Sequence, residues 1–189
     1  MCWITDICMI VLENTMDLRT EKSKKAITEA FLALRARRPL EKITVRELCQ
    51  RAQVNRSTFY AHFQDVYDLS DRLENAAVQA VLDSIAHPEA ALQDTVQFTR
   101  ELFAAFAPQE RQLNILFSGS RQGQMCLKIA AALMELIYQH YPERRDDLEF
   151  RIALTFRIYG GYYAFAENRR YGEEQVIAAI GRLSNGSST

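Results

Sequence analysis

Glycine is missing from the first 118 of the 189 residues, and the four prolines of the chain are widely spaced. β-Strands that are joined by tight turns need frequent glycine, asparagine or proline residues at those turns. So long a stretch without glycine argues for helices, with a break at each proline. The sequence therefore predicts an all-α protein.

Long apolar runs are also missing. None approaches the roughly 20 residues that a membrane-spanning helix needs, which argues against an integral membrane protein. Residues 1–16 contain a short apolar run at 7–12 but no basic leading segment and no small-residue cleavage site. We therefore predict no signal peptide and expect a cytoplasmic protein. Residues 1–16 are interpreted as an N-terminal extension, either upstream of a true start at Met16 or an extra helix that packs on the body.

Motifs for nucleotides, metals and redox chemistry are absent. The sequence has no G-x-x-x-x-G-K, no G-x-G-x-x-G, no C-x-x-C and no H-E-x-x-H, and its three histidines are far apart. We therefore expect no metal, no cofactor and no catalytic residues. An enzyme that uses the thiol of Cys126 is the remaining catalytic alternative, whereas Cys49, on an apolar helical stretch, is predicted to be a small core residue.

The charge is unevenly distributed. Residues 17–66 contain eleven basic and six acidic residues, a local net charge of +5, so the rest of the chain carries −6 of the overall −1. A basic segment on an acidic body suggests a module that binds a polyanion. The alternative is a basic helix face that is merely solvated.

Apolar periodicity and breaks predict about nine helices. We expect a domain at 17–66, a larger helical domain at 67–183 and a polar tail at 184–189. The first helix spans about 19–37, the second follows Thr44, the third follows Asn55, and the fourth follows Asp65 and ends near Pro88. The body helices are expected at 91–107, 110–117, 122–141, 145–168 and 173–183.

The segment from Thr44 to Phe63 is the most informative. Thr44 and Glu47 have the spacing of a capping box at the start of a helix, and Asn55 is placed to cap the next helix. Only two residues separate the two helices, so they must meet at a steep angle, as in a helix-turn-helix. The apolar side chains that can share one small core are Val45, Leu48, Ala52, Val54, Phe59 and Phe63.

The third helix is predicted to have a small, polar outer face. At about 100° per residue, Phe59 and Phe63 point inward while Ser57 and Ala61 point away from them. Short outward side chains let a helix lie deep in the major groove of DNA, where it meets base edges. The other residues that can reach phosphates or bases are Arg56, Thr58, Tyr60 and His62.

The string ITVRELCQRAQVNRSTFYAHFQDVYDL at 43–69 resembles the DNA-binding domain of the TetR family of bacterial regulators. The T-x-x-E-L start, the A-x-V turn and the T-F-Y-x-H-F core carry this resemblance, which covers about residues 19–69. It implies a homodimer with a three-helix DNA-binding domain and a larger helical domain for ligand binding and dimerisation. It also implies that the protein binds a palindromic operator and dissociates from it when a small-molecule effector binds.

The resemblance assigns roles to individual residues and has two departures. Thr44, Thr58, Tyr60 and His62 match positions that commonly contact phosphates, and Arg56 and Ser57 match positions near base edges. The turn position that is usually glycine is Gln53, and a left-handed conformation there would cost about 1–2 kcal/mol. A position that is often lysine at the start of the fourth helix is Val66.

The body has no comparably specific motif. The aromatic and sulfur-containing side chains that could line a ligand cavity, or could simply form core, are Phe98, Phe103, Phe106, Met125, Tyr138, Phe156 and Tyr159. Gly160 and Gly161 interrupt a predicted helix at a cost of about 1 kcal/mol each, which close approach of two helices could offset. In the family, the last two helices form the dimer interface, so we expect Gly160, Tyr163 and Ile180 to lie there; a kink or tight intrachain packing is the alternative.

Three functions follow from these observations. The first is a dimeric DNA-binding transcriptional regulator, a repressor released by a small-molecule effector. The second is a regulator of the same fold without ligand control that acts through a protein partner. The third is a helical enzyme with a vestigial N-terminal domain.

Overall fold

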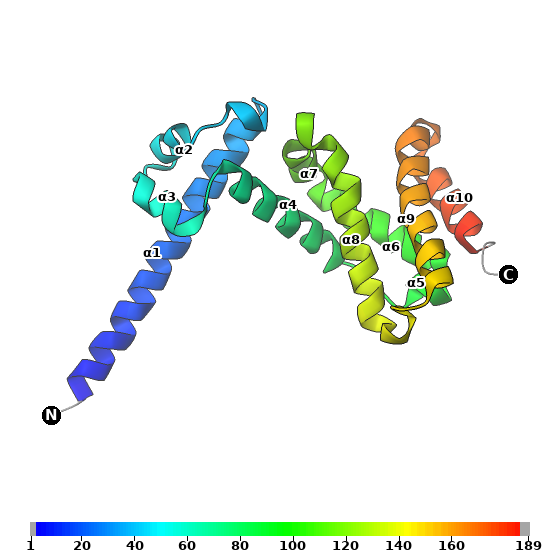
Figure 1. The fold of residues 1–189 in the computed structure, drawn as a ribbon, viewed down its shortest axis with the longest axis horizontal. Coiled ribbons are helices and arrows are strands. Elements are labelled where there is room, and N and C mark those ends of the chain that lie inside the picture. The colour runs from blue at the N-terminus through cyan, green and yellow to red at the C-terminus, as the bar shows by residue number, and fades with distance from the viewer. Residues whose placement is uncertain (1–2, 186–189) are drawn as a thin grey trace. The chain divides into compact units, whose positions relative to one another are not determined.

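The computed structural model describes residues 3–185 and the side-chain surroundings of residues 19–184. The described residues form helices and connecting segments without strands, which confirms the predicted all-α fold class (Figure 1). The α-helices are α1 (Trp3–Arg35), α2 (Val45–Ala52), α3 (Arg56–His62), α4 (Val66–Leu82), α5 (Ala90–Gln93), α6 (Thr95–Phe106), α7 (Glu110–Leu116), α8 (Gln122–His140), α9 (Leu148–Asn168) and α10 (Glu173–Asn185). Short 3₁₀ turns are η1 (Leu40–Lys42), η2 (Ala107–Gln109), η3 (Gly119–Arg121), η4 (Pro142–Arg144) and η5 (Arg169–Tyr171). No helix among the described residues is both long enough and apolar enough to cross a membrane.

The chain divides into two compact units. Unit 1 comprises residues 1–73 and contains α1, α2 and α3, and unit 2 comprises residues 74–189 and contains α5 to α10. The division falls within α4, whereas the sequence placed a boundary at residue 66.

The first helix is much longer than expected. It begins at Trp3, not near residue 19, because no proline or glycine in 3–18 interrupts it. It ends at Arg35, ahead of Pro39. The predicted N-terminal extension is thus a continuation of α1, except for residues 1–2, which lie outside the described part of the chain. The predicted polar tail also lies largely outside it, because the description ends at residue 185.

Unit 1 has one small core where α1, α2 and α3 pack together. Its most completely buried side chains are Ile27, Phe31, Leu40, Leu48, Phe59 and Leu69. Complete burial of a side chain of this size stabilises a fold by about 1.5–3 kcal/mol. The small helices therefore derive their stability from this shared core more than from their own hydrogen bonds.

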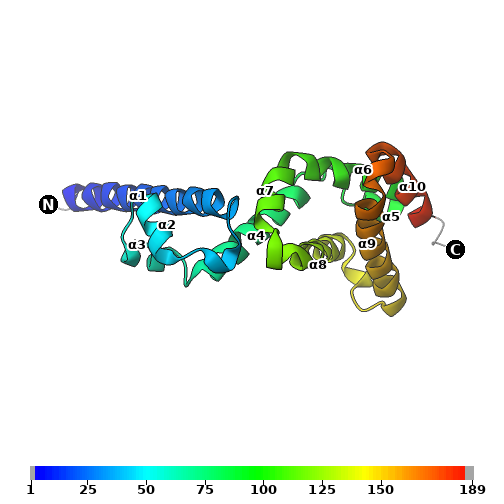
Figure 2. The same cartoon turned by 90° about the horizontal axis from the view of Figure 1, so that it is seen from above.

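Unit 2 is held by close helix contacts. α6 packs most extensively against α10, and α9 packs against both α8 and α10 (Figures 1 and 2). At Gly181, a Cβ atom would lie 2.9 Å from the Cα of Val96, so only glycine permits this approach of α10 to α6. The buried side chains of α7 and α8 include Leu113, Leu116, Ala130, Leu133 and Ile137.

One predicted body helix is wrong. The segment 91–107 is broken at Asp94, which leaves helical geometry with φ −141° and ψ 83° and accepts a hydrogen bond from the backbone N–H of Gln97. An aspartate in this position starts a new helix, so α5 and α6 are separate. The same device starts α9 three residues later than expected, because Asp147 accepts from the N–H of Phe150 at 3.0 Å.

Candidate nucleic-acid interface

The predicted capping box at the start of α2 is present. The backbone N–H of Glu47 donates to Oγ1 of Thr44 at 3.3 Å, and Oε2 of Glu47 accepts from the backbone N–H and the hydroxyl of Thr44 at 3.3 Å and 3.0 Å. Arg38 donates to Oε1 of Glu47 at 2.8 Å. This bond, followed by that from Thr44, holds the pKa of the Glu47 carboxyl below its usual value. The exposed Thr44 hydroxyl is therefore already committed within the cap.

The turn between α2 and α3 is left-handed at Gln53, the position that is usually glycine in the family. Gln53 has φ 55° and ψ 40° and is left-handed, and it is the only non-glycine residue with positive φ among the described residues. The carbonyl oxygen of Cys49 accepts hydrogen bonds from the N–H groups of Gln53 and Val54. As predicted, Cys49 is a buried core thiol. This left-handed residue ends α2 and lets α3 begin three residues later, at Arg56.

Asn55 organises the start of α3. Its side-chain oxygen accepts from the backbone N–H of Thr58 at 2.8 Å, and also from the hydroxyls of Ser57 at 2.7 Å and Thr58 at 2.8 Å. Each of these hydroxyls has a single proton. Donation to a phosphate therefore requires Ser57 or Thr58 to leave Asn55, a coupling between cap and contact that the sequence did not reveal.

The two faces of α3 are those predicted from its helical wheel. Phe59 is fully buried, and Phe63 directly after the helix is also buried. The exposed side chains are Arg56, Ser57, Tyr60 and Ala61, with Tyr60 57% exposed. The rings of Phe59 and Tyr60 meet edge to face at 5.5 Å, which anchors Tyr60 beside the core while its hydroxyl stays exposed.

His62 and Val66 have roles that the sequence analysis did not assign. Nε2 of His62 lies 2.7 Å from the hydroxyl of Ser23 in α1. That hydroxyl donates to the carbonyl of Thr20, so it accepts from Nε2–H of His62. His62 therefore fastens α3 to α1, and only its other ring nitrogen remains for a phosphate. Val66 is buried, which explains an apolar residue where the family often has lysine.

The basic charge of the N-terminal segment lies on the surface. Ten of its eleven basic side chains are exposed, and the exception, Arg35, is buried and donates to the carbonyl of Arg38. Exposed cations beside a helix with a small polar face suit a duplex whose backbone is uniformly negative. The members near α2 and α3 are Arg37, Arg38, Lys42, Arg46, Arg51 and Arg56.

Unit 2 contains a cavity of about 530 Å³. The predicted lining residues that do line it are Phe98, Phe103, Phe106 and Met125. The other three lie elsewhere: Tyr138 is buried against the ring of Phe150, Tyr159 is half-buried, and Phe156 is 74% exposed. The reason is the rotation of α9 about its axis, which turns Phe156 outward.

The three predicted dimer residues do not share a face. Gly160 is exposed, with open space where a Cβ would be, and Tyr163 is 56% exposed. Ile180 is buried, and a Cβ at Gly161 would lie 3.5 Å from its Cγ2. Ile180 therefore belongs to the contact between α9 and α10 within the chain and does not share an exposed face with Gly160 and Tyr163.

No cluster of three or more histidine, cysteine, aspartate or glutamate residues within the described residues is placed to hold a metal ion. Cys126 is buried and its pKa is raised by that burial, so the neutral thiol is favoured. A neutral, buried thiol is a poor nucleophile.

Comparisons with known proteins agree with this geometry. Residues 27–72 match the family described as bacterial regulatory proteins, tetR family. Among solved structures, the chain resembles a candidate TetR family transcription regulator from Shewanella sp. PV-4, with a TM-score of 0.52 and 16% identity over 86% of this chain and 95% of the other. At this identity the likeness establishes the fold. No curated protein matches the sequence. The family match coincides with the helix-turn-helix, so residues 27–72 form a DNA-binding domain of the kind found in bacterial regulatory proteins of the tetR family.

Proposed function

We propose that this chain is a dimeric repressor in the cytoplasm that binds a palindromic operator through α3 and is released by a small molecule in the unit 2 cavity. The observation that carries the DNA-binding mode is the exposed face of α3. Its centre has only Ser57 and Ala61, so the helix backbone can approach the floor of the major groove. Arg56 and Ser57 then face bases, while Thr44, Thr58, Tyr60 and His62 face phosphates.

The dimer is supported by an apolar stripe on α9. Leu148, Ile152, Phe156 and Tyr163 are all more than half exposed, and Gly160 lies among them. Spacings of three and four residues place them on one face of the helix. Since an exposed apolar patch of this kind marks an association surface, a twofold pairing of α9 with its copy would bury it and present two α3 helices.

The proposal is tested by selecting bound fragments from random DNA and measuring their affinity at increasing salt. We expect palindromic sites with half-sites about one helical turn apart, and affinity that falls steeply with salt. Tyr60→Ala should weaken every site about tenfold or more, whereas Tyr171→Ala, an exposed tyrosine in unit 2, should change nothing. Binding of all duplexes with one common, weak affinity would contradict the proposal.

The dimer has a separate test. Phe156→Glu should halve the mass measured by light scattering, because it places a charge in the middle of the stripe, and Tyr171→Glu should leave the mass unchanged. An unchanged mass for Phe156→Glu would move the interface elsewhere. If a dimer binds DNA and no small molecule alters that affinity, the regulator without ligand control becomes the better description.

A further inference from the structure

The contact between α3 and α1 determines which ring nitrogen of His62 carries the proton. α3 packs against α1 (Figure 1), and Nε2 of His62 lies 2.7 Å from Oγ of Ser23. Ser23 donates its single hydroxyl proton to the carbonyl oxygen of Thr20 at 2.9 Å. The proton in the contact with His62 therefore belongs to Nε2. A neutral imidazole has only one N–H, so its Nδ1 has a lone pair and no proton.

Nδ1 of His62 is the ring nitrogen that a ligand can reach. It makes no hydrogen bond with any residue in the described part of the chain. It is also not one of the buried atoms that lack a partner, so solvent reaches it although the residue is half-buried. The ring of Phe63, 5.9 Å away, offers no hydrogen-bond donor or acceptor in the ring plane. A neutral His62 therefore presents a lone pair, and not a donor, to whatever binds at this nitrogen.

The charges around His62 do not include a bonded carboxylate within the described residues. Arg19 is exposed one helical turn before Ser23, on the same side of α1. On α4, Arg72 pairs with Asp68 at 2.8 Å. A phosphate would therefore be the first anion to contact His62. Other charged or titratable side chains on the elements packed around α3 include Lys22 and Lys24 of α1, Cys49 and Arg51 of α2, and Arg56 and Tyr60 of α3 itself.

From this arrangement we infer that His62 contacts an operator phosphate as the imidazolium, with Ser23 as its positioning residue. The inference rests on the proposed binding of DNA through α3. An imidazolium donates from both nitrogens, so it keeps its bond to Ser23 while Nδ1–H donates to the phosphate. A neutral ring can donate from Nδ1 only if Ser23 turns its proton away from Thr20. A charged donor also makes a bond about twice as strong as that of a neutral donor.

The consequence is an operator affinity that falls as pH rises. Wherever the imidazole of the free chain is neutral, each protomer must take up a proton from solvent when it binds DNA, so high pH opposes binding. Histidine is the side chain whose charge ordinarily changes between about pH 5 and 8, so the effect lies in that range. At lower pH the free and bound chains both carry the proton, and His62 no longer makes the affinity depend on pH.

The test measures the affinity of the full chain for its selected operator duplex at about pH 6 and about pH 8, at constant ionic strength. We expect the parent chain to bind about tenfold or more tightly at pH 6, as befits a charge-assisted hydrogen bond. His62→Gln should remove most of this difference, whereas His140→Gln, which removes an exposed histidine of unit 2, should preserve it. Equal affinity at both pH values in the parent, or a difference that His62→Gln retains, would overturn the inference.

Ser23→Ala tests the positioning role. Without the hydroxyl, a neutral ring is free to carry its proton on Nδ1, so the ratio of the two affinities should shrink by about threefold or more through a gain at pH 8. A purely structural role would lower both affinities by the same factor. Ser23→Thr keeps a hydroxyl and should restore the parent ratio, and Thr28→Ala, at another half-buried residue of α1, should leave it unchanged. An unchanged ratio in Ser23→Ala would overturn the role of Ser23.

The position of the proton can be observed without DNA. Nitrogen-15 resonances of the histidine rings at about pH 8 distinguish the two tautomers, and their comparison with His62→Gln identifies the signals of His62. We expect Nε2–H in the parent chain, and Nδ1–H would overturn the inference.

Failure of this inference is distinguishable from failure of the proposed function. An operator that is bound with the same affinity at every pH would overturn the inference and leave the proposed DNA binding intact. Failure to prefer any duplex at any pH would contradict the proposed function and, with it, the phosphate contact.

Discussion

The exposed faces of α3 and α9 are opposite in character. On α3, the surface residues are Arg56, Ser57, Tyr60 and Ala61, a mostly polar set with small side chains at its centre. On α9, the exposed stripe is apolar and includes Ile152 and Phe156. Both helices belong to the same all-α fold, so the class of fold does not decide what a helix binds. The chemistry of the exposed face decides it. A polar face such as that of α3 suits a phosphate-rich duplex, and an apolar face such as that of α9 suits a protein surface.

The two units also differ in where they place charge. In unit 1, ion pairs such as that between Arg38 and Glu47 lie at the surface. In unit 2, Glu74 of α4 is completely buried, and Arg121 donates to its two carboxylate oxygens at 2.9 Å and 2.5 Å. Lys128 lies 3.5 Å from the same carboxylate. A buried carboxylate with two cations makes unit 2 more sensitive to the loss of one charge than unit 1.

The largest expected effect is that of Arg121→Ala. It should lower the free energy of unfolding by about 3 kcal/mol, because it removes the guanidinium that donates to both oxygens of the buried Glu74 carboxylate. Urea denaturation measures this change. Arg38→Ala removes an exposed partner of Glu47 and should cost less than about 1 kcal/mol. Equal losses in the two variants would remove the contrast between the units.

The next effect compares two glycines of unit 2. Gly181→Ala should destabilise the chain by about 1–3 kcal/mol, because its Cβ would meet the backbone of Val96 at 2.9 Å. Gly160→Ala meets nothing within 4 Å in the chain and should stabilise α9 by up to about 1 kcal/mol. Thermal unfolding of both variants shows whether each substitution raises or lowers the stability. Gly160→Ala could instead lower the unfolding midpoint by an amount that depends on protein concentration. That result would mean that the close approach at Gly160 occurs between two chains.

The sequence predicted the features that depend on neighbouring residues, and it did not predict those that depend on contacts between distant parts of the chain. The caps by Thr44 and Asn55 and the inward Phe59 are set by neighbours within a few residues, and the spacing alone predicted them. The contact of His62 with Ser23 joins residues 39 apart in sequence, and no local pattern reports it. The rotation of α9, which exposes Phe156, depends on how several helices pack.

One missed feature did have a local signal. Asp94 is followed at the usual capping distance by the backbone N–H of Gln97, and an aspartate inside a predicted helix was reason to divide it into α5 and α6. The cavity lining was predictable only in part. Aromatic residues in the 91–107 segment did line it, because that segment faces the core along most of its length. Those of α9 needed the tertiary structure.

A smaller effect tests the local device in unit 1. Asn55→Ala should cost about 1 kcal/mol of unfolding free energy, since it removes the acceptor of the Thr58 N–H at the start of α3. Asn55→Asp keeps an acceptor and should be nearly neutral. Denaturant midpoints at constant slope measure both. A neutral Asn55→Ala would mean that the helix start is held by the core around Phe59 and not by its cap.

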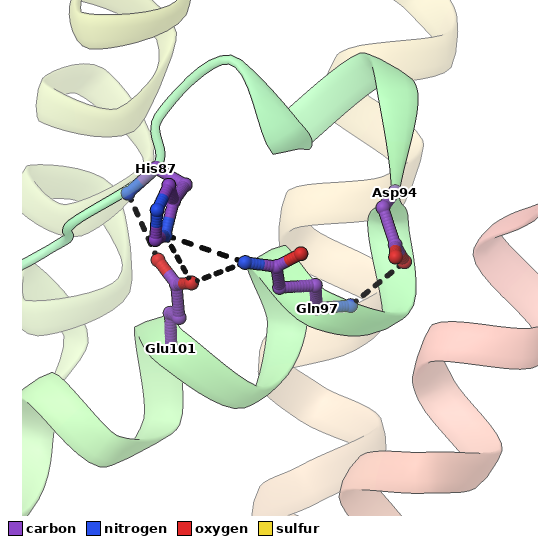
Figure 3. A network of polar contacts seen from close by, with 4 residues as sticks. All are labelled: His87, Asp94, Gln97 and Glu101. Atoms are coloured by element: carbon purple, nitrogen blue, oxygen red, sulfur yellow. Dashed lines mark hydrogen bonds and ion pairs between the residues drawn. The ribbon is translucent and has the colours of Figure 1, made fainter.

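The smallest effect concerns His87, in the connection between α4 and α5, and its pH dependence. Nδ1 of His87 lies 2.8 Å from Oε1 of Glu101 (Figure 3). The other carboxylate oxygen, Oε2, accepts from the backbone N–H of His87 at 3.0 Å. Gln97 donates to Oε1 of Glu101 from its side-chain amide. The bond to Glu101 raises the pKa of His87 above 6.5, and the bonds from Gln97 and then His87 lower the pKa of Glu101 below 4.5. The side chain of His87 is about half exposed.

The signs of these shifts define a window. The raised pKa of His87 contributes stability that is fully present below pH 6.5 and is lost as pH rises through the folded-state pKa. The lowered pKa of Glu101 contributes stability above pH 4.5 that is lost as pH falls through its folded-state value. Nuclear magnetic resonance titration should place the His87 pKa above 6.5, and Glu101→Gln should bring it down. Glu135→Gln, which removes an exposed carboxylate paired with Arg145, should leave it unchanged. An unshifted His87 in the parent chain would mean that this surface contact does not persist in solution, and that exposed pairs in unit 2 matter as little as those in unit 1.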